Sequence, residues 1–213
     1  MKFRKHFESA ISHLTSMGAE YDMYQGEAVS ETTIANLEAK LGWSLPTELR
    51  EFYLEMGDGF SICPHGDEGG FFVEPMCELE AKNSWEDQVE GCFTMVDDSP
   101  DAASKAEEEF QRRLNWFPFH GFGSGGYFFC IDTNEPRGPI RYYERVYWPT
   151  DSPEQWSFSL ADSLEDLVTQ WSRYCFAGPT DSGGMINHVM GLEGRFDWQT
   201  TPFPDIYKRN PKA

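Results

Sequence analysis

The chain has 213 residues, of which 39% are hydrophobic and 15% aromatic. A chain of this size can bury about 70% of the surface of its unfolded form, so the composition predicts a globular core and excludes wholesale disorder. The net charge of −19 argues against nucleic acid and anionic membranes as partners, because both repel an acidic protein.

The amino-terminal residues predict an amphipathic helix rather than a signal segment. Phe3, Phe7, Ile11 and Leu14 recur on one helical face, and Gly18 is a suitable residue to end the helix. No apolar run in the chain approaches the roughly 20 residues that span a bilayer. We therefore expect a cytoplasmic protein without a membrane segment.

A second short helix is predicted to begin at a serine and end at a glycine. The hydroxyl of Ser30 can accept a free amide of the first turn. Ile34, Leu37 and Leu41 then follow at three- and four-residue steps and form one apolar stripe. Gly42 supplies the left-handed residue that commonly ends such a helix.

A third helix is predicted after a hinge of four residues, Gly42-Trp43-Ser44-Leu45. Pro46 sits in its first turn, where proline is best tolerated, and the glycine-rich turn Gly57-Asp58-Gly59 ends it. Its predicted buried face consists of Leu49, Phe52, Tyr53 and Met56.

The middle of the chain is strongly acidic. Residues 55–110 hold 16 acidic residues against two lysines, a local net charge of −14. We interpret about 60–115 as an insertion on the scaffold, with a short strand at Gly69–Val73 and a helix from Ser99-Pro100 through Leu114. Its charge fits a basic partner, although simple solubility explains it equally well.

The second half predicts antiparallel sheet. The dense apolar run Tyr127–Asp132 is short enough for a buried strand. A turn at Asn134–Gly138 leads to a second strand at Ile140–Val146, and together they predict a hairpin. A third strand is expected near Trp156–Phe158.

The end of the chain predicts a helix followed by an irregular extension. The apolar spacing after Ser159 predicts a helix that runs to about Phe176. Residues 177–213 are rich in glycine, proline and polar residues. We expect them to lie on the body through Trp198, Phe203 and Tyr207.

Three patches of sequence carry a family resemblance. The first is the pair of helices that ends in the glycine-rich turn; the second is Phe117–Phe119 followed by a glycine-rich turn and Tyr127–Asp132; the third is the late helix. They resemble the SUKH superfamily, which unites the fungal Smi/Knr cell-wall regulators with bacterial immunity proteins and Syd. The usual glycine-rich turn begins with asparagine, whereas this chain has Met56-Gly57-Asp58. The positions that match the family pattern are Leu41, Gly42, Leu45, Pro46, Phe52, Gly57, Gly59, Gly126 and Asp132.

The resemblance implies an α+β binding fold and not an enzyme. Amino-terminal helices would pack on a mostly antiparallel sheet, with a further helix near the end of the chain, in one domain at 1–176. Bacterial members are often immunity proteins that neutralise a toxin, commonly a nuclease. Whether this chain forms a homodimer stays open.

An acidic surface suits such a partner. Toxins that act on nucleic acid carry basic surfaces, and opposite charge accelerates association. The alternatives are a regulatory or scaffold module of the Smi/Knr type, and an enzyme with an unrecognised site. The carboxylates expected to bind the partner are Asp58, Asp67, Glu68, Glu86, Asp87, Glu90, Asp97 and Asp98.

Catalytic and metal-binding motifs are weak. Gly121–Gly126 satisfies G-x-G-x-x-G, but it opens a strand, whereas a dinucleotide site needs a helix at that point. Cys63 and His65 are separated by a single residue, unlike zinc-ligand pairs. His120 and His188 are the candidate general bases, and lone histidines are more often structural. The five cysteines (63, 77, 92, 130 and 175) predict reduced thiols, and we expect no cofactor and no metal.

Overall fold

The computed structural model describes residues 1–65, 70–76, 79, 85–86, 89, 100–122, 127–144, 157–178, 195–201, 203 and 209–213. Helices occupy most of the amino-terminal part, the strands form antiparallel sheets, and a helix lies near the end of the chain, so the fold is α+β, as the sequence predicted. No helix among these residues is long and apolar enough to cross a membrane.

The first sheet has three antiparallel strands in the order β1-β2-β3. They are β1 (Tyr21–Gln25), β2 (Phe60–Pro64) and β3 (Phe71–Val73). Buried and partly buried side chains alternate along β2, so only one face of this sheet packs directly on the core.

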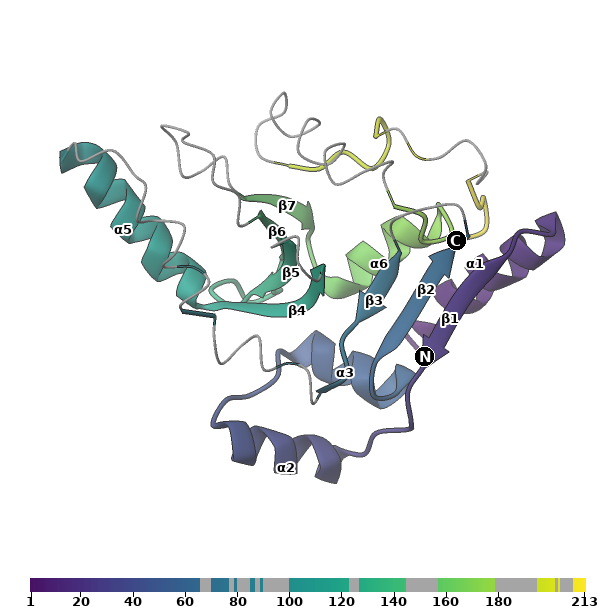
Figure 1. Ribbon diagram of the computed structural model, residues 1–213, viewed down its shortest axis with the longest axis horizontal. Helices are drawn as coiled ribbons and strands as arrows, with labels where there is room; N and C mark the ends of the chain where they lie inside the picture. Colours follow the sequence, from purple (N-terminus) through teal and green to yellow (C-terminus); the bar gives the residue numbers. More distant parts are fainter. Residues whose placement is uncertain are drawn as a thin grey trace.

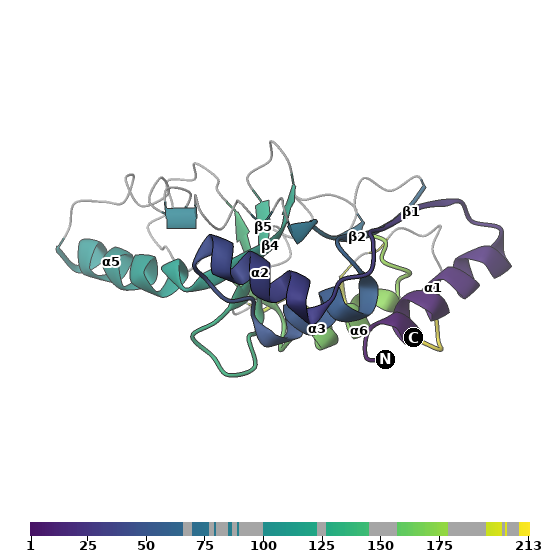
Figure 2. The same ribbon diagram turned by 90° about the horizontal axis from the view of Figure 1, so that it is seen from below.

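Three helices cover that face of the first sheet. They are α1 (Arg4–Met17), α3 (Thr47–Met56) and α6 (Leu164–Ser172), and Figure 2 shows them on one side of β1 and β2. The predicted faces of α1 and α3 are the buried ones. Phe7 of α1 lies at the centre of the aromatic core, with ring centroids 4.4 Å from Phe60 and 4.5 Å from Phe176.

The second sheet has four antiparallel strands in chain order. They are β4 (Trp116–Phe122), β5 (Tyr127–Asp132), β6 (Ile140–Glu144) and β7 (Ser157–Ala161). The backbone N–H of Glu74 donates to the carbonyl of Phe119 at 3.3 Å, which links the end of β3 to β4. Helix α5 (Pro100–Leu114) leads into β4 and extends away from both sheets (Figure 1).

Both faces of the second sheet are covered, which explains the dense apolar run of β5. Phe129 and Ile131 face the main core. Cys130, between them, faces a smaller cluster on the opposite side. This second cluster consists of Trp85, Val89, Trp116, Cys130 and Tyr143, with Phe110 and Phe128 packed against it.

Two expectations for the late helix need correction, and two strands were missed. The late helix begins after Ser163, whose hydroxyl accepts the N–H of Asp166, and not after Ser159, which lies in β7. It ends at Ser172 rather than near Phe176, and Cys175 and Phe176 adopt positive φ. Strands β1 and β2 were not predicted.

The carboxyl-terminal residues that the structure describes pack on the body. Trp198 is buried, and its indole N–H donates to the carbonyl of Leu160 at 2.7 Å. Phe203 is partly buried and stacks on Tyr174. Tyr207, the third predicted anchor, lies outside the described residues.

Candidate functional site

The family-motif residues at the junction of α2 (Glu31–Leu41) and α3 hold two helices together. Gly42 ends α2 with a φ of 74°. The backbone N–H of Leu45 donates to Oε1 of Glu38 at 2.9 Å, and the guanidinium of Arg50 binds Oε2 of the same carboxylate at 2.8 Å. The carboxylate of Glu38 on α2 therefore binds both the backbone before α3 and a side chain of α3, and it links the two helices.

Pro46 and Phe52 complete the structural part of this motif. Pro46 occupies the position just before α3, one residue earlier than predicted, and its carbonyl accepts the N–H of Arg50. Phe52 is fully buried. Its ring lies edge-on to Phe3 at 5.2 Å and to Phe60 at 6.3 Å, so it joins α1, α3 and the first sheet.

The turn Gly57-Asp58-Gly59 joins separate chain segments at close range. Both glycines have positive φ, 105° and 85°. A Cβ at Gly57 would lie 2.6 Å from the carbonyl oxygen of Gly26, which leaves no room for a side chain. The carboxylate of Asp58 accepts the N–H of Met76 at 2.7 Å. This turn therefore serves the fold.

Asp132, the last described motif position, is buried and fixes the turn after β5. Its Oδ1 accepts the backbone N–H of Asn134 at 3.1 Å, and its Oδ2 accepts Nε–H of Arg141 at 3.2 Å. Gly126 lies outside the described residues.

Two of the eight predicted partner-binding carboxylates lie within the described residues. Asp58 is half-buried and occupied by its bond to Met76. Glu86 is exposed next to the buried Trp85. The other six, Asp67, Glu68, Asp87, Glu90, Asp97 and Asp98, lie outside the described part of the chain.

Strand β1 carries the most exposed acidic and apolar side chains of the first sheet. Glu20, just before it, and Asp22, within it, have side chains that are 84% and 82% exposed. Met23 and Tyr24 are 49% and 53% exposed. With Met17 they make up three of the four large hydrophobic residues that are exposed among the described residues. Such residues gathered within eight positions suggest an interaction surface.

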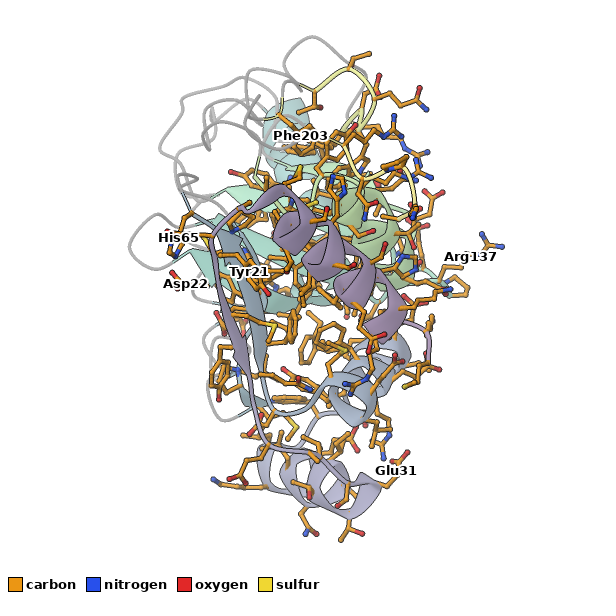
Figure 3. The ribbon with its side chains drawn as sticks, turned by 90° about the vertical axis from the view of Figure 1, so that its right-hand side faces the viewer. Tyr21, Asp22, Glu31, His65, Arg137 and Phe203 are labelled. Carbon is orange, nitrogen blue, oxygen red and sulfur yellow. The ribbon has the colours of Figure 1, made fainter. Side chains whose placement is uncertain are left out.

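His65, at the end of β2, lies between the two exposed carboxylates. Its Nδ1 is 3.2 Å from a carboxylate oxygen of Glu20, and its Nε2 is 3.0 Å from one of Asp22. The hydrogen bonds to Asp22 and Glu20 raise the pKa of the imidazole above its ordinary value. Figure 3 shows Tyr21, Asp22 and His65 together at this end of the strand.

This surface was not predicted from the sequence. No element was predicted between Gly18 and Ser30, although Tyr21 and Tyr24 are typical strand formers between two glycines. His65 was considered only as a partner of Cys63 for zinc.

The candidate catalytic residues do not assemble a site among the described residues. Burial lowers the pKa of His120 to about 3, so its imidazole is neutral at physiological pH. Its Nδ1 is 2.6 Å from the carbonyl oxygen of Phe72, and its ring stacks on Phe129 at 4.4 Å. His188 lies outside the described residues. No group of three or more His, Cys, Asp or Glu residues suited to a metal occurs in the described part of the chain.

The comparison with known families agrees with this arrangement. A family model described as SMI1 / KNR4 family (SUKH-1) matches residues 28–170, about two thirds of the chain. The chain belongs to the SMI1/KNR4 family. The match covers helices α2 and α3 and the second sheet, and it confirms the predicted resemblance. Helix α1 and strand β1 precede the matched range.

This family is associated with protein–protein interaction and toxin binding, and its members are generally non-catalytic. A search of curated proteins finds no individual relative.

Proposed function

We propose that this chain is a non-catalytic immunity protein that binds and neutralises a basic toxin in the cytoplasm of the cell that makes it. The family match over residues 28–170 carries this proposal, because it assigns the chain to a family of protein-binding modules. The described motif residues support it: they bond and pack within the fold and leave no group poised for catalysis among them.

The charge of the chain suggests the chemistry of the toxin. A net charge of −19 creates a field that attracts basic surfaces over distances of about 8 Å at physiological ionic strength. Nucleases present basic surfaces to their substrates. An acidic protein that covers such a surface gains association rate from steering, and it also blocks access to nucleic acid.

The first test is capture and rescue. The tagged chain is purified from its native cell, bound proteins are identified by mass spectrometry, and the captured protein is then expressed with and without this chain. We expect the captured protein to be basic, to stop growth when expressed alone, and to lose that effect in the presence of this chain. A captured protein that is harmless alone would instead favour the regulatory alternative of the Smi/Knr type.

The second test locates the acidic contact. Reversal of Glu86, Asp87, Asp97 and Asp98 to lysine should slow association with the captured partner by about tenfold and weaken its salt dependence, because charges at an interface rim act mainly on the on-rate. The control reverses Glu107 and Glu108, which are exposed on α5 and outside the predicted set. Equal rates for the wild type and the first variant would show that these carboxylates only solvate the surface.

A further inference from the structure

The outer edge of β1 presents backbone groups in a defined order. Among the described residues, β1 pairs only with β2, so its other edge has no partner strand. The N–H of His65 donates to the carbonyl of Glu20, and the N–H of Gly26 donates to that of Gly59. Since hydrogen-bonded and non-bonded pairs alternate in an antiparallel ladder, Asp22 and Tyr24 bond to β2. Tyr21, Met23 and Gln25 therefore direct their N–H and C=O groups outward.

The side chains along this edge form two different rows. The register places Asp22 opposite Cys63 and Tyr24 opposite Ser61, so Glu20, Asp22 and Tyr24 share the outer face of the sheet. That row holds two carboxylates followed by an aromatic ring. Tyr21, Met23 and Gln25 share the face toward the helices, where Met23 is half exposed.

A long exposed edge with apolar side chains is normally protected, because it can pair with another strand. Here the protection is negative charge. Glu20 and Asp22 repel other acidic chains, a second copy with its net charge of −19 included, but attract a strand that places lysine or arginine opposite them. The edge therefore favours a basic extended segment over a copy of itself.

We propose that β1 is a docking strand, to which an extended segment of the partner protein adds as a fourth strand, with basic residues opposite Glu20 and Asp22 and an apolar residue opposite Tyr24. Main-chain hydrogen bonds to Tyr21, Met23 and Gln25 supply affinity, and the outer row of side chains supplies selectivity. The proposal rests on the proposed function only for the kind of protein that carries this segment.

A synthetic peptide tests the strand directly. In antiparallel pairing, acetyl-Thr-Tyr-Val-Lys-Val-Lys-Thr-amide places tyrosine opposite Tyr24 and its two lysines opposite Asp22 and Glu20. Titration of the isotope-labelled full chain should shift the amide resonances of Tyr21, Met23 and Gln25 in a saturable way. N-methylation of the two valines, whose N–H groups would point at β1, should abolish these shifts. N-methylation of the first lysine, whose N–H points away, should preserve them.

Two variants of the chain test the same contact from the other side. Met23→Pro removes an outward donor without removing a bond to β2, and proline is tolerated at the edge of a sheet. The double reversal E20K/D22K changes the charge and keeps the backbone. We expect each variant to bind the peptide at least about tenfold more weakly, whereas E107K/E108K, with the same change of net charge on α5, binds as the wild type does.

Each result of these experiments either supports the docking strand or overturns it. Shifts at Tyr21, Met23 and Gln25 that both variants weaken support the docking strand, and if Met23→Pro fails to fold, E20K/D22K decides. No saturable binding at millimolar peptide, or binding that E20K/D22K leaves intact, overturns it. A wild-type dimer that Met23→Pro dissociates also overturns it, because a second copy then occupies the edge. If E20K/D22K neutralises a captured toxin as well as the wild type does, the docking strand is refuted and the proposed function stands. If the peptide binds at β1 but the capture experiment yields no toxin, only the proposed function is refuted.

Discussion

The helix pair α2–α3 and the strand β1 pack against the same core, yet they use their carboxylates in opposite ways. In the helix pair, Glu38 accepts bonds from the backbone of Leu45 and from Arg50. At β1, the side chains of Glu20 and Asp22 are more than four fifths exposed and lie beside His65. The described acidic residues therefore include one whose largely shielded side chain joins two helices and two whose side chains stay largely exposed although they contact His65.

This difference matters for function because a high count of acidic residues does not locate a binding surface. Asp58 was predicted to bind the partner together with seven other carboxylates, and in the structure its carboxylate also accepts the backbone N–H of Met76 within the fold. A partner that recognises charge needs carboxylates that are exposed and free to change neighbours. Among the described residues, those at β1 meet this condition together with exposed apolar side chains.

The greatest loss of stability is expected from a substitution in the helix pair. Phe52→Ala removes a fully buried ring that contacts α1, α3 and the first sheet, and should lower the free energy of unfolding by about 3–5 kcal/mol. Urea unfolding monitored by circular dichroism measures this loss. The matched substitution Tyr24→Ala, at an exposed ring of β1, should cost far less. Similar losses for the two variants would show that the helix pair and β1 contribute alike to stability.

A smaller effect is expected at Glu55, which caps a helix to which it does not belong. Helix α1 has no capping side chain of its own, and the carboxylate of Glu55 on α3 accepts the backbone N–H groups of Lys2, Phe3 and Arg4 at 2.7–3.0 Å. Burial opposes the charged form, but these three bonds lower the pKa of the carboxyl below its ordinary value. Glu55→Gln should therefore cost about 1–2 kcal/mol at neutral pH, as the loss of a helix cap does.

The pH dependence of stability gives a second readout of Glu55. Because its pKa is lower in the folded chain than in the unfolded chain, its contribution is fully present above the ordinary value of about 4.5 and is lost as the pH falls through the folded pKa. The difference between the wild type and Glu55→Gln should accordingly shrink between pH 6 and pH 3. A constant difference in urea unfolding over this range would exclude the charge as the cause.

A helix or strand could be predicted where features of its own local sequence determined its type and its ends. The stripe Ile34, Leu37 and Leu41 between Ser30 and Gly42 predicted α2 at its observed bounds, because capping and periodicity agree there. The late helix was placed four residues too early because Leu160, which continues its apolar spacing, belongs to β7. An apolar residue at the end of a buried strand has no local feature that distinguishes it from the first turn of a helix.

There is a physical reason why the candidate site could not be predicted from the sequence. Strand β1 owes its conformation to pairing with β2, which lies more than 30 residues away in the chain, and its five residues have no alternating apolar pattern because four of them are exposed. The approach of His65 to Glu20 and Asp22 follows from the register of this pairing. The local sequence shows which residues are charged, but the pairing of distant segments decides which charged side chains lie next to one another.

The smallest effect concerns His65 and connects the exposed carboxylates to the partner. Bonds to Asp22 and Glu20 raise the pKa of the imidazole above 6.5, so its contribution to stability is fully present below that value and is lost as the pH rises through the folded pKa. Asp22→Asn should return the pKa toward 6.5, which a pH titration of the imidazole proton resonances by nuclear magnetic resonance measures. Glu107→Gln on α5 is the control and should leave the titration unchanged.

The pKa of His65 should also respond to a partner bound at β1. A lysine that docks at Glu20 and Asp22 brings positive charge next to the imidazole and disfavours its protonated form, so the pKa of His65 should fall when the basic peptide binds. By linkage, the peptide should bind more tightly as the pH rises through the pKa of His65. Binding that is independent of pH between 5.5 and 8, with an unchanged titration of His65, would place the peptide away from these carboxylates and leave them as solvated charges like those on α5.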